Sequence, residues 1–249
     1  MTDMKCIEYG KQNREVIMLL HGGGLSWWNY KAEAELLSGR YHIVLPILDG
    51  HAESDEDFVS IEENAARVIS LIDSKYGGSV LCMGGLSLGA QILVEILSQR
   101  QAICRYAMIE SAAVIPSRMT NALIGPMLSS SFCLIRKKWF ARIQFDSLHI
   151  RDDLFGMYFR DTAKTSKNNM IAFLKANTAY EPKPELQKCR ARVRIIVGER
   201  EQKGMLRSAR LLQRMLPEST MEIKKGLFHG EFSLNHPEQY AAELCDMMA

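Results

Sequence analysis

The pattern Gly85-x-Ser87-x-Gly89 lies between two apolar runs of different period. The run Ser79–Met83 is typical of a buried strand, and Ala90–Gln99 carries apolar residues at helical spacing. A serine on a tight turn between a strand and a helix exposes its hydroxyl at the carboxyl edge of the sheet. Glycine is needed two residues to either side, because a Cβ there would crowd the adjoining backbone. The segment therefore predicts an α/β fold with Ser87 as a candidate nucleophile.

A second strand-like run, Val16–Leu20, ends in a histidine and three glycines at positions 21–24. Backbone N–H groups in such a glycine loop can turn towards a developing negative charge. The N–H of Leu88 directly follows the candidate nucleophile and would supply one such donor. The second donor of this oxyanion hole would be the N–H of Gly23 or Gly24.

Acidic residues and a histidine follow two later strand-like runs. Val193–Val197 leads into Gly198–Glu201, and the short run Met221–Lys224 is followed by His229. Serine, then acid, then histidine is a chain order in which catalytic triads occur. The carboxyl ends of the strands would therefore bring three chemically complementary groups to one edge of the sheet.

The roles of these groups follow from their chemistry. Ser87 is a weak nucleophile unless a base removes its proton, and His229 is the candidate base. An ionised Glu201 would hold the imidazole in one tautomer and stabilise the imidazolium that forms. Glu199 lies two positions earlier, and Glu110 ends another strand, so both remain alternative acids.

These segments resemble the α/β-hydrolase superfamily over nearly the whole chain. Leu20–Gly24 looks like the family's oxyanion segment. Leu48–Ser54 is similar to its aspartate-x-glycine-histidine-glycine-x-serine turn, shifted slightly, with Ala52 replacing the second glycine. Gly198–Glu201 matches the strand end where the family usually carries an aspartate, and Phe228–Gly230 resembles its histidine loop. The resemblance implies a mostly parallel sheet flanked by helices, and Gly23 rather than Gly24 as the second oxyanion donor.

The alternation of strands and helices stops between about Pro116 and Glu185, where amphipathic helices are expected instead. In the family an insertion at this point forms a cap over the pocket. The resemblance thus implies a core of residues 1–115 and 186–249 and a helical cap of residues 116–185. The cap holds 11 Lys/Arg against 6 Asp/Glu, a net charge of +5 that favours an anionic substrate. Gly24 and Trp28, beside the glycine loop, are predicted to contact the substrate.

Composition and charge restrict the classes of partner that the chain could bind. A net charge of +2 gives no general case for nucleic acid or membranes, and no apolar run approaches the length of a membrane span. Residues 1–6 lack a secretory apolar segment, and the six cysteines show no C-x-x-C pair or zinc spacing. We therefore expect a cytoplasmic protein with reduced thiols that needs neither a metal nor an organic cofactor. Its oligomeric state is not indicated by the sequence.

The sequence predicts a serine hydrolase that cleaves a small or medium carboxylic ester or thioester through an acyl-enzyme. Similar triads also cleave amides and C–C bonds and perform lyase reactions, so the fold and the triad leave the reaction open. A non-catalytic or slow ligand-binding protein is the alternative, favoured by the glutamate at position 201 and by the large Met-rich cap. Nucleotide binding is excluded at the glycine loops, since neither completes a dinucleotide or P-loop pattern.

Overall fold

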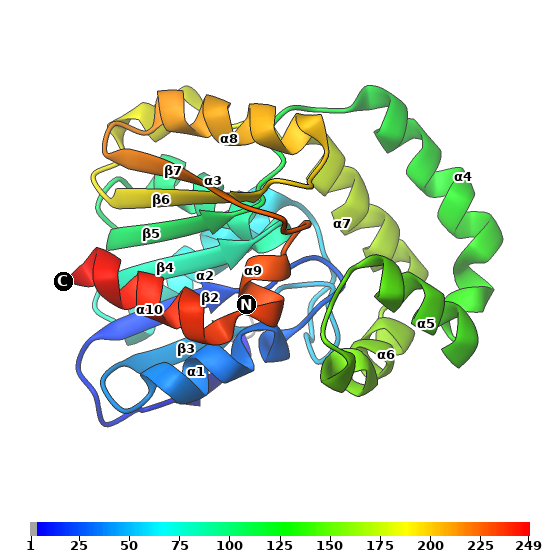
Figure 1. Ribbon diagram of the computed structural model, residues 1–249, viewed down its shortest axis with the longest axis horizontal. Coiled ribbons are helices and arrows are strands. Elements are labelled where there is room, and N and C mark those ends of the chain that lie inside the picture. The colour runs from blue at the N-terminus through cyan, green and yellow to red at the C-terminus, as the bar shows by residue number, and fades with distance from the viewer. Residues whose placement is uncertain (1–3) are drawn as a thin grey trace.

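One sheet of seven strands, in the order β1-β3-β2-β4-β5-β6-β7, forms the centre of the computed structural model, which describes residues 4–249 (Figure 1). Residues 1–3, where the expected core begins, lie outside the described residues. β1 is antiparallel to β3, and every other neighbouring pair is parallel. The strands are β1 (Cys6–Tyr9), β2 (Val16–Leu20), β3 (His42–Pro46), β4 (Val80–Leu86), β5 (Cys104–Glu110), β6 (Arg192–Gly198) and β7 (Ser219–Lys224).

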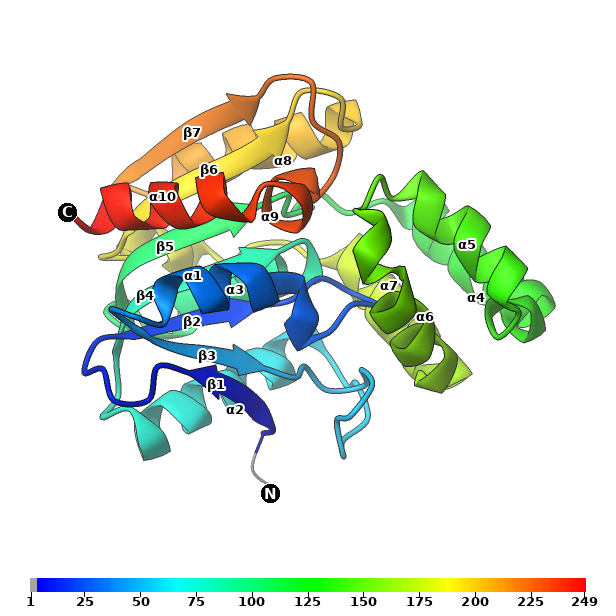
Figure 2. The ribbon, with the colours of Figure 1, turned by 60° about the horizontal axis from the view of Figure 1, so that its bottom comes forward.

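Helices cover both faces of the sheet (Figures 1 and 2). Along β2, Ile17 and Leu19 pack into one apolar cluster, while Met18 and Leu20 pack into the other. Such strands, buried on both faces, are expected of a parallel sheet whose connections are helical. The first cluster includes side chains of α1 (Lys31–Leu37) and α10 (Pro237–Met248), and the second those of α2 (Ile61–Lys75), α3 (Leu88–Gln99) and α8 (Lys203–Met215).

Local sequence signals fix several element ends. Ser60 caps α2, because its Oγ accepts the N–H of Glu63 at 3.1 Å, the bond that the sequence Ser60-Ile61-Glu62-Glu63 predicts. β4 continues to Leu86, beyond the predicted end at Met83. Its two glycines favour no strand by propensity, yet they pair with β2 on one side and β5 on the other. The position of Ser87 is therefore set by tertiary pairing as well as by the turn.

The segment between β5 and β6 is helical and lies beyond the arrowheads of the parallel strands in both views (Figures 1 and 2). We call α4 to α7 the helical insertion. It touches the core through buried contacts: the indole N–H of Trp28, in η1 (Trp27–Tyr30), donates to Asp161 at 2.8 Å. Its elements are α4 (Arg118–Ile135), α5 (Lys138–Ser147), η2 (Asp152–Leu154), α6 (Phe155–Lys164) and α7 (Lys167–Ala179), and η3 (Pro184–Lys188) follows. None of the helices formed by residues 4–249 is long and apolar enough to cross a membrane.

Candidate active site

The turn between β4 and α3 holds Ser87 in a backbone conformation that L-residues seldom adopt, with φ +52°. The turn is tight on both sides of the serine. A Cβ on Gly85 would lie 2.6 Å from the carbonyl oxygen of Gly89, and a Cβ on Gly89 would lie 2.2 Å from that of Leu20. The glycine requirement predicted from the sequence is therefore a requirement of close backbone packing. The N–H of Ser87 donates to the Glu110 carbonyl at 2.9 Å, which ties the turn to the end of β5.

Three side chains form a chain of hydrogen bonds at this edge of the sheet. His229 Nε2 lies 3.0 Å from Ser87 Oγ, and His229 Nδ1 lies 2.7 Å from Glu201 Oε2. The Glu201 side chain is 1% exposed, whereas that of His229 is 46% exposed. With its Nδ1 proton directed at the carboxylate, the imidazole presents an unprotonated Nε2 to the serine hydroxyl. A proton can thus pass from Ser87 to His229 without any rearrangement.

Two further donors hold the Glu201 carboxylate. Its Oε1 accepts the N–H of Gly198 at 2.7 Å and the hydroxyl of Ser111 at 2.8 Å. Burial alone would raise the pKa of Glu201, but the hydrogen bonds from His229, Gly198 and Ser111 outweigh it and lower the pKa below its usual value. These hydrogen bonds therefore favour the ionised form of the carboxylate that contacts the imidazole.

The two alternative acids have other partners. Glu199 accepts the N–H of Gly226 at 2.8 Å, and Glu110 accepts the N–H of Ser233 at 3.2 Å. Of the three candidate acids, Glu201 is the one whose carboxylate contacts His229. The glutamate side chain, one methylene longer than aspartate, spans the distance from the end of β6 to the imidazole.

The glycine loop after β2 lies directly against the start of α3. A Cβ on Gly23 would lie 3.5 Å from the Cβ of Leu88, so the backbones that carry the two expected oxyanion donors are neighbours. Leu88 is the first residue of α3, and its N–H belongs to the first turn, where intrahelical acceptors are lacking. Gly24 takes a positive φ of +75° at the far side of the loop. The arrangement leaves the N–H groups of Gly23 and Leu88 without an acceptor among residues 4–249.

The His21 side chain holds the glycine loop in place through hydrogen bonds. The N–H of Leu48 donates to His21 Nε2 at 3.1 Å, so the ring carries its proton on Nδ1, which donates to the Gly22 carbonyl at 2.9 Å. Burial, together with the nearby His51, lowers the pKa of His21 to about 3. A neutral histidine with a hydrogen bond at each ring nitrogen thus fixes the shape of the glycine loop.

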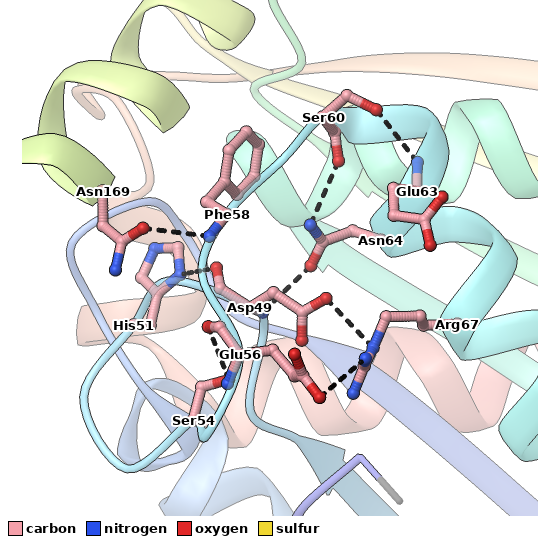
Figure 3. A network of polar contacts seen from close by, with 10 residues as sticks. All are labelled: Asp49, His51, Ser54, Glu56, Phe58, Ser60, Glu63, Asn64, Arg67 and Asn169. Atoms are coloured by element: carbon pink, nitrogen blue, oxygen red, sulfur yellow. Dashed lines mark hydrogen bonds and ion pairs between the residues drawn. The ribbon is translucent and has the colours of Figure 1, made fainter. Parts of the chain in front are cut away.

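The loop between β3 and α2 contacts the glycine loop, since the rings of His21 and His51 lie 4.9 Å apart. Polar contacts also join it to α7 of the insertion (Figure 3). Asp49 donates its N–H to Asn64 at 3.0 Å, and its carboxylate forms an ion pair with Arg67 at 3.0 Å. The N–H of Phe58 donates to Asn169 of α7 at 3.0 Å. His51 stacks on a phenylalanine of α7, with ring centroids 4.7 Å apart. This network holds α7 against the loop between β3 and α2.

A small cavity of about 70 Å³ adjoins Ser87 and His229. Apart from the glycines of the two loops, its walls are apolar. They combine side chains of the core with two from the insertion, and are formed by Leu25, Leu86, Leu148, Ile150 and Leu234. A space of this size accepts a small apolar group next to the serine.

Trp28 does not line this cavity, contrary to the expectation that it contacts the substrate. It is 1% exposed, and its indole N–H is bonded to Asp161 of the insertion. The buried side chain therefore joins the core to the insertion. Gly24 is likewise absent from the cavity wall, while Gly23 belongs to it.

A larger cleft of about 520 Å³ opens on the other side of His229, between the insertion and α8. Glu201 and His229 form its inner end, and Ile115 and Met205 are among its apolar walls. Its polar side chains include those of Thr120, Asn177, Gln202 and Arg207. His229 thus lies between a small apolar cavity and a larger cleft of mixed polarity.

Sequence reasoning missed Ser111, Leu148 and Ile150. Ser111 follows the last residue of β5, so its place at the carboxyl end of a strand was an available signal. Leu148 and Ile150 lie in the turn after α5, and no sequence pattern distinguishes them. Among the residues described, no group of three His, Cys, Asp or Glu side chains is placed to hold a metal ion.

A profile described as the alpha/beta hydrolase family matches residues 17–243, which is most of the chain. The chain belongs to the alpha/beta hydrolase family. The order of nucleophile, acid and histidine and the seven-stranded sheet agree with that membership. A search of curated proteins found no match.

Solved structures of several alpha/beta hydrolases are similar to the whole chain. A thermophilic esterase from Thermogutta terrifontis has a TM-score of 0.79 at 14% identity, covering 98% of this chain and 92% of its own. The enol-lactonase from Burkholderia xenovorans has a TM-score of 0.79 at 15% identity, with 98% and 96% covered. A meta-cleavage product hydrolase from Pseudomonas fluorescens has a TM-score of 0.77 at 13% identity, with 98% and 93% covered. At such identities the likeness shows the fold alone.

Proposed function

We propose that this alpha/beta hydrolase is a serine hydrolase that cleaves a carboxylic ester or thioester through an acyl-enzyme. The observation that carries the proposal is the continuous chain of hydrogen bonds from Ser87 through His229 to Glu201. It lies beside two free backbone N–H groups, those of Gly23 and Leu88. A nucleophile, a base, an oriented acid and an oxyanion hole are the parts that acyl transfer requires.

The proposed reaction begins when His229 Nε2 takes the hydroxyl proton as Ser87 Oγ attacks the carbonyl carbon. The tetrahedral oxyanion accepts hydrogen bonds from the N–H groups of Gly23 and Leu88, and Glu201 stabilises the imidazolium. Collapse breaks the bond to the leaving alcohol or thiol, which receives the proton from His229. Water then repeats the sequence on the acyl-enzyme, releases the acid and restores Ser87.

The two spaces beside His229 indicate how a substrate would be divided. The cavity of about 70 Å³ suits a small apolar group, and the cleft of about 520 Å³ suits the larger part of the substrate. Small and medium acyl esters fit this division. The similar enol-lactonase and meta-cleavage product hydrolase use the same fold for other bonds. A screen for the substrate should therefore include esters, thioesters, lactones and compounds with a cleavable C–C bond.

Labelling with a fluorophosphonate tests the nucleophile directly. We expect an adduct on Ser87 in the wild type, mapped by mass spectrometry, and none in Ser87→Ala. The Ser87→Ala variant should keep the wild-type melting temperature and lose turnover, since removing a triad nucleophile costs on the order of 10⁶-fold in kcat.

Ser74→Ala is the matched control, because the Ser74 hydroxyl is exposed and bonds only within its own helix. It should label and turn over as the wild type does. Unchanged turnover in Ser87→Ala would refute the proposal. A ligand that raises the melting temperature of unlabelled wild type without being consumed would instead favour a binding protein.

A further inference from the structure

Exposed apolar side chains gather on the helical insertion. Ten large apolar residues are exposed in the described part of the chain, and seven of them lie within residues 115–148. Scattered single ones are ordinary on a protein surface, whereas a concentration of this kind marks an interaction site. We call these seven the α4–α5 face: Ile115, Met119, Leu123, Met127, Trp139, Ile143 and Leu148.

Their spacing places them on one side of each helix. Met119, Leu123 and Met127 recur every four residues along α4, and Trp139 and Ile143 do so on α5. Other positions of both helices are already used in packing, through buried residues such as Ile124 and Ile135 of α4 and Ala141 and Phe145 of α5. The exposed stripe is therefore additional to the stripe that holds the insertion together.

Positive charge predominates around the face, where Asp146 is the single acidic residue between Ser111 and Leu148. From Ser111 to Phe145 the sequence has no Asp or Glu and five Lys/Arg. Arg142 is paired with Asp146 and Asp152. The other four cations have no ion pair with any residue from 4 to 249; they are Arg118, Arg136, Lys137 and Lys138. Three of these adjoin Trp139, whose side chain is 60% exposed.

We propose that the α4–α5 face binds the surface of an anionic lipid bilayer. Basic residues beside exposed Trp, Leu and Met side chains are the composition of helices that lie in a membrane interface without crossing it. Tryptophan favours the headgroup level because its ring is apolar and its N–H is polar. The net charge of the whole chain is only +2, so the attraction to anionic headgroups would come from the cations of the insertion.

A second copy of the chain is a poorer occupant. In a two-fold symmetric dimer the same patch faces itself, so the four unpaired cations of one copy would approach those of the other. Like charges across an interface oppose association, whereas anionic headgroups neutralise them.

The face continues into the site. Ile115 is 45% exposed and also forms part of the wall of the cleft that ends at Glu201 and His229. An acyl chain leaving a bilayer held against the face would meet this cleft first. That consequence rests on the proposed function, whereas bilayer binding does not.

Vesicle flotation tests the binding. The full chain is mixed with vesicles of phosphatidylcholine alone, or of phosphatidylcholine and phosphatidylglycerol in equal parts, at low and high salt. We expect flotation with the anionic vesicles that weakens as salt is added. Lys137→Gln/Lys138→Gln should lower the affinity by roughly 20-fold, since each such charge near an anionic surface contributes about fivefold.

The apolar contribution has a matched control. Leu123→Ser/Trp139→Ser should weaken binding by about tenfold or more. Leu36→Ser/Val59→Ser removes two side chains of comparable exposure, 54% and 73%, from outside the face and should bind as the wild type does. Circular dichroism confirms that each variant folds. Ser87→Ala should float normally, so a failure of catalysis is separable from a failure of binding.

Three results would overturn the proposal. The first is no flotation with anionic vesicles. The second is equal loss in the control pair and the face pair. The third is a dimer in analytical ultracentrifugation that Leu123→Ser/Trp139→Ser dissociates, with no vesicle binding, which would assign the face to self-association.

Discussion

Glu110 is a carboxyl group that the proposed chemistry does not use, and it ends β5 with its side chain 1% exposed. Burial raises its pKa to about 7, and its hydrogen bonds to Ser233 only partly offset that effect. The folded protein therefore binds a proton at Glu110 between pH 4.5 and about 7 that the unfolded chain releases. Stability from this group is full below pH 4.5 and is lost as pH rises through about 7.

Glu110→Gln should remove that loss. The amide oxygen can still accept the N–H of Ser233, and it does not ionise. We expect the free energy of unfolding of the variant to exceed that of the wild type above pH 7, by up to about 3 kcal/mol. Urea denaturation across the pH range measures the difference, which should vanish below pH 4.5. A difference that is constant with pH would contradict this account.

Among the elements, α3 is held unusually close to the sheet by its second residue. A Cβ on Gly89 would meet two backbone carbonyl oxygens, those of Leu20 at 2.2 Å and His21 at 2.5 Å. Neither is free to move, because β2 is a central strand and His21 fixes the glycine loop. The position of α3 depends on this contact, and so does the position of the Leu88 N–H.

Gly89→Ala should destabilise the protein by about 3 kcal/mol or more, because the added methyl overpacks a rigid site. Gly156→Ala is its control, at the second residue of α6, where a Cβ would meet nothing within 4 Å. There the change should be neutral or stabilising by up to about 1 kcal/mol, from helix propensity. Urea denaturation of both variants gives the comparison. Similar losses in the two would show that the α3 contact is not tight.

In the molecule as a whole, the insertion is joined to the core by a few buried polar contacts. Asp161 of α6 is 1% exposed and accepts the Trp28 N–H and two hydrogen bonds from Arg160. On the other side, Gln91 of α3 and Asn177 of α7 exchange hydrogen bonds. These contacts hold α6 and α7 against the core, and Asn177 also lines the cleft.

Asp161→Ala should loosen the packing of α6 against the core locally. The Trp28 N–H would be left buried without an acceptor, at a cost of about 1–3 kcal/mol. Amide hydrogen exchange should speed up in α6 and η1 while β4 and β5 keep their protection. Asp153→Ala is the control, since Asp153 is exposed and pairs only with Arg151 at the surface. Equal acceleration in both variants would count against a role for the buried contact.

Local sequence signals predicted the core of this protein well. Strand period, helix period, the Ser60 cap and the glycines around Ser87 act between residues close in the chain, and the chain order placed Ser87, Glu201 and His229 at one sheet edge. Other features depend on packing between distant segments. The direction of Trp28, the contact of Ser111 with Glu201 and the exposure of the α4–α5 face are of this kind. The sequence of an amphipathic helix does not distinguish an apolar residue that faces a core from one that faces solvent. Only the tertiary structure therefore decided which side of α4 was left exposed.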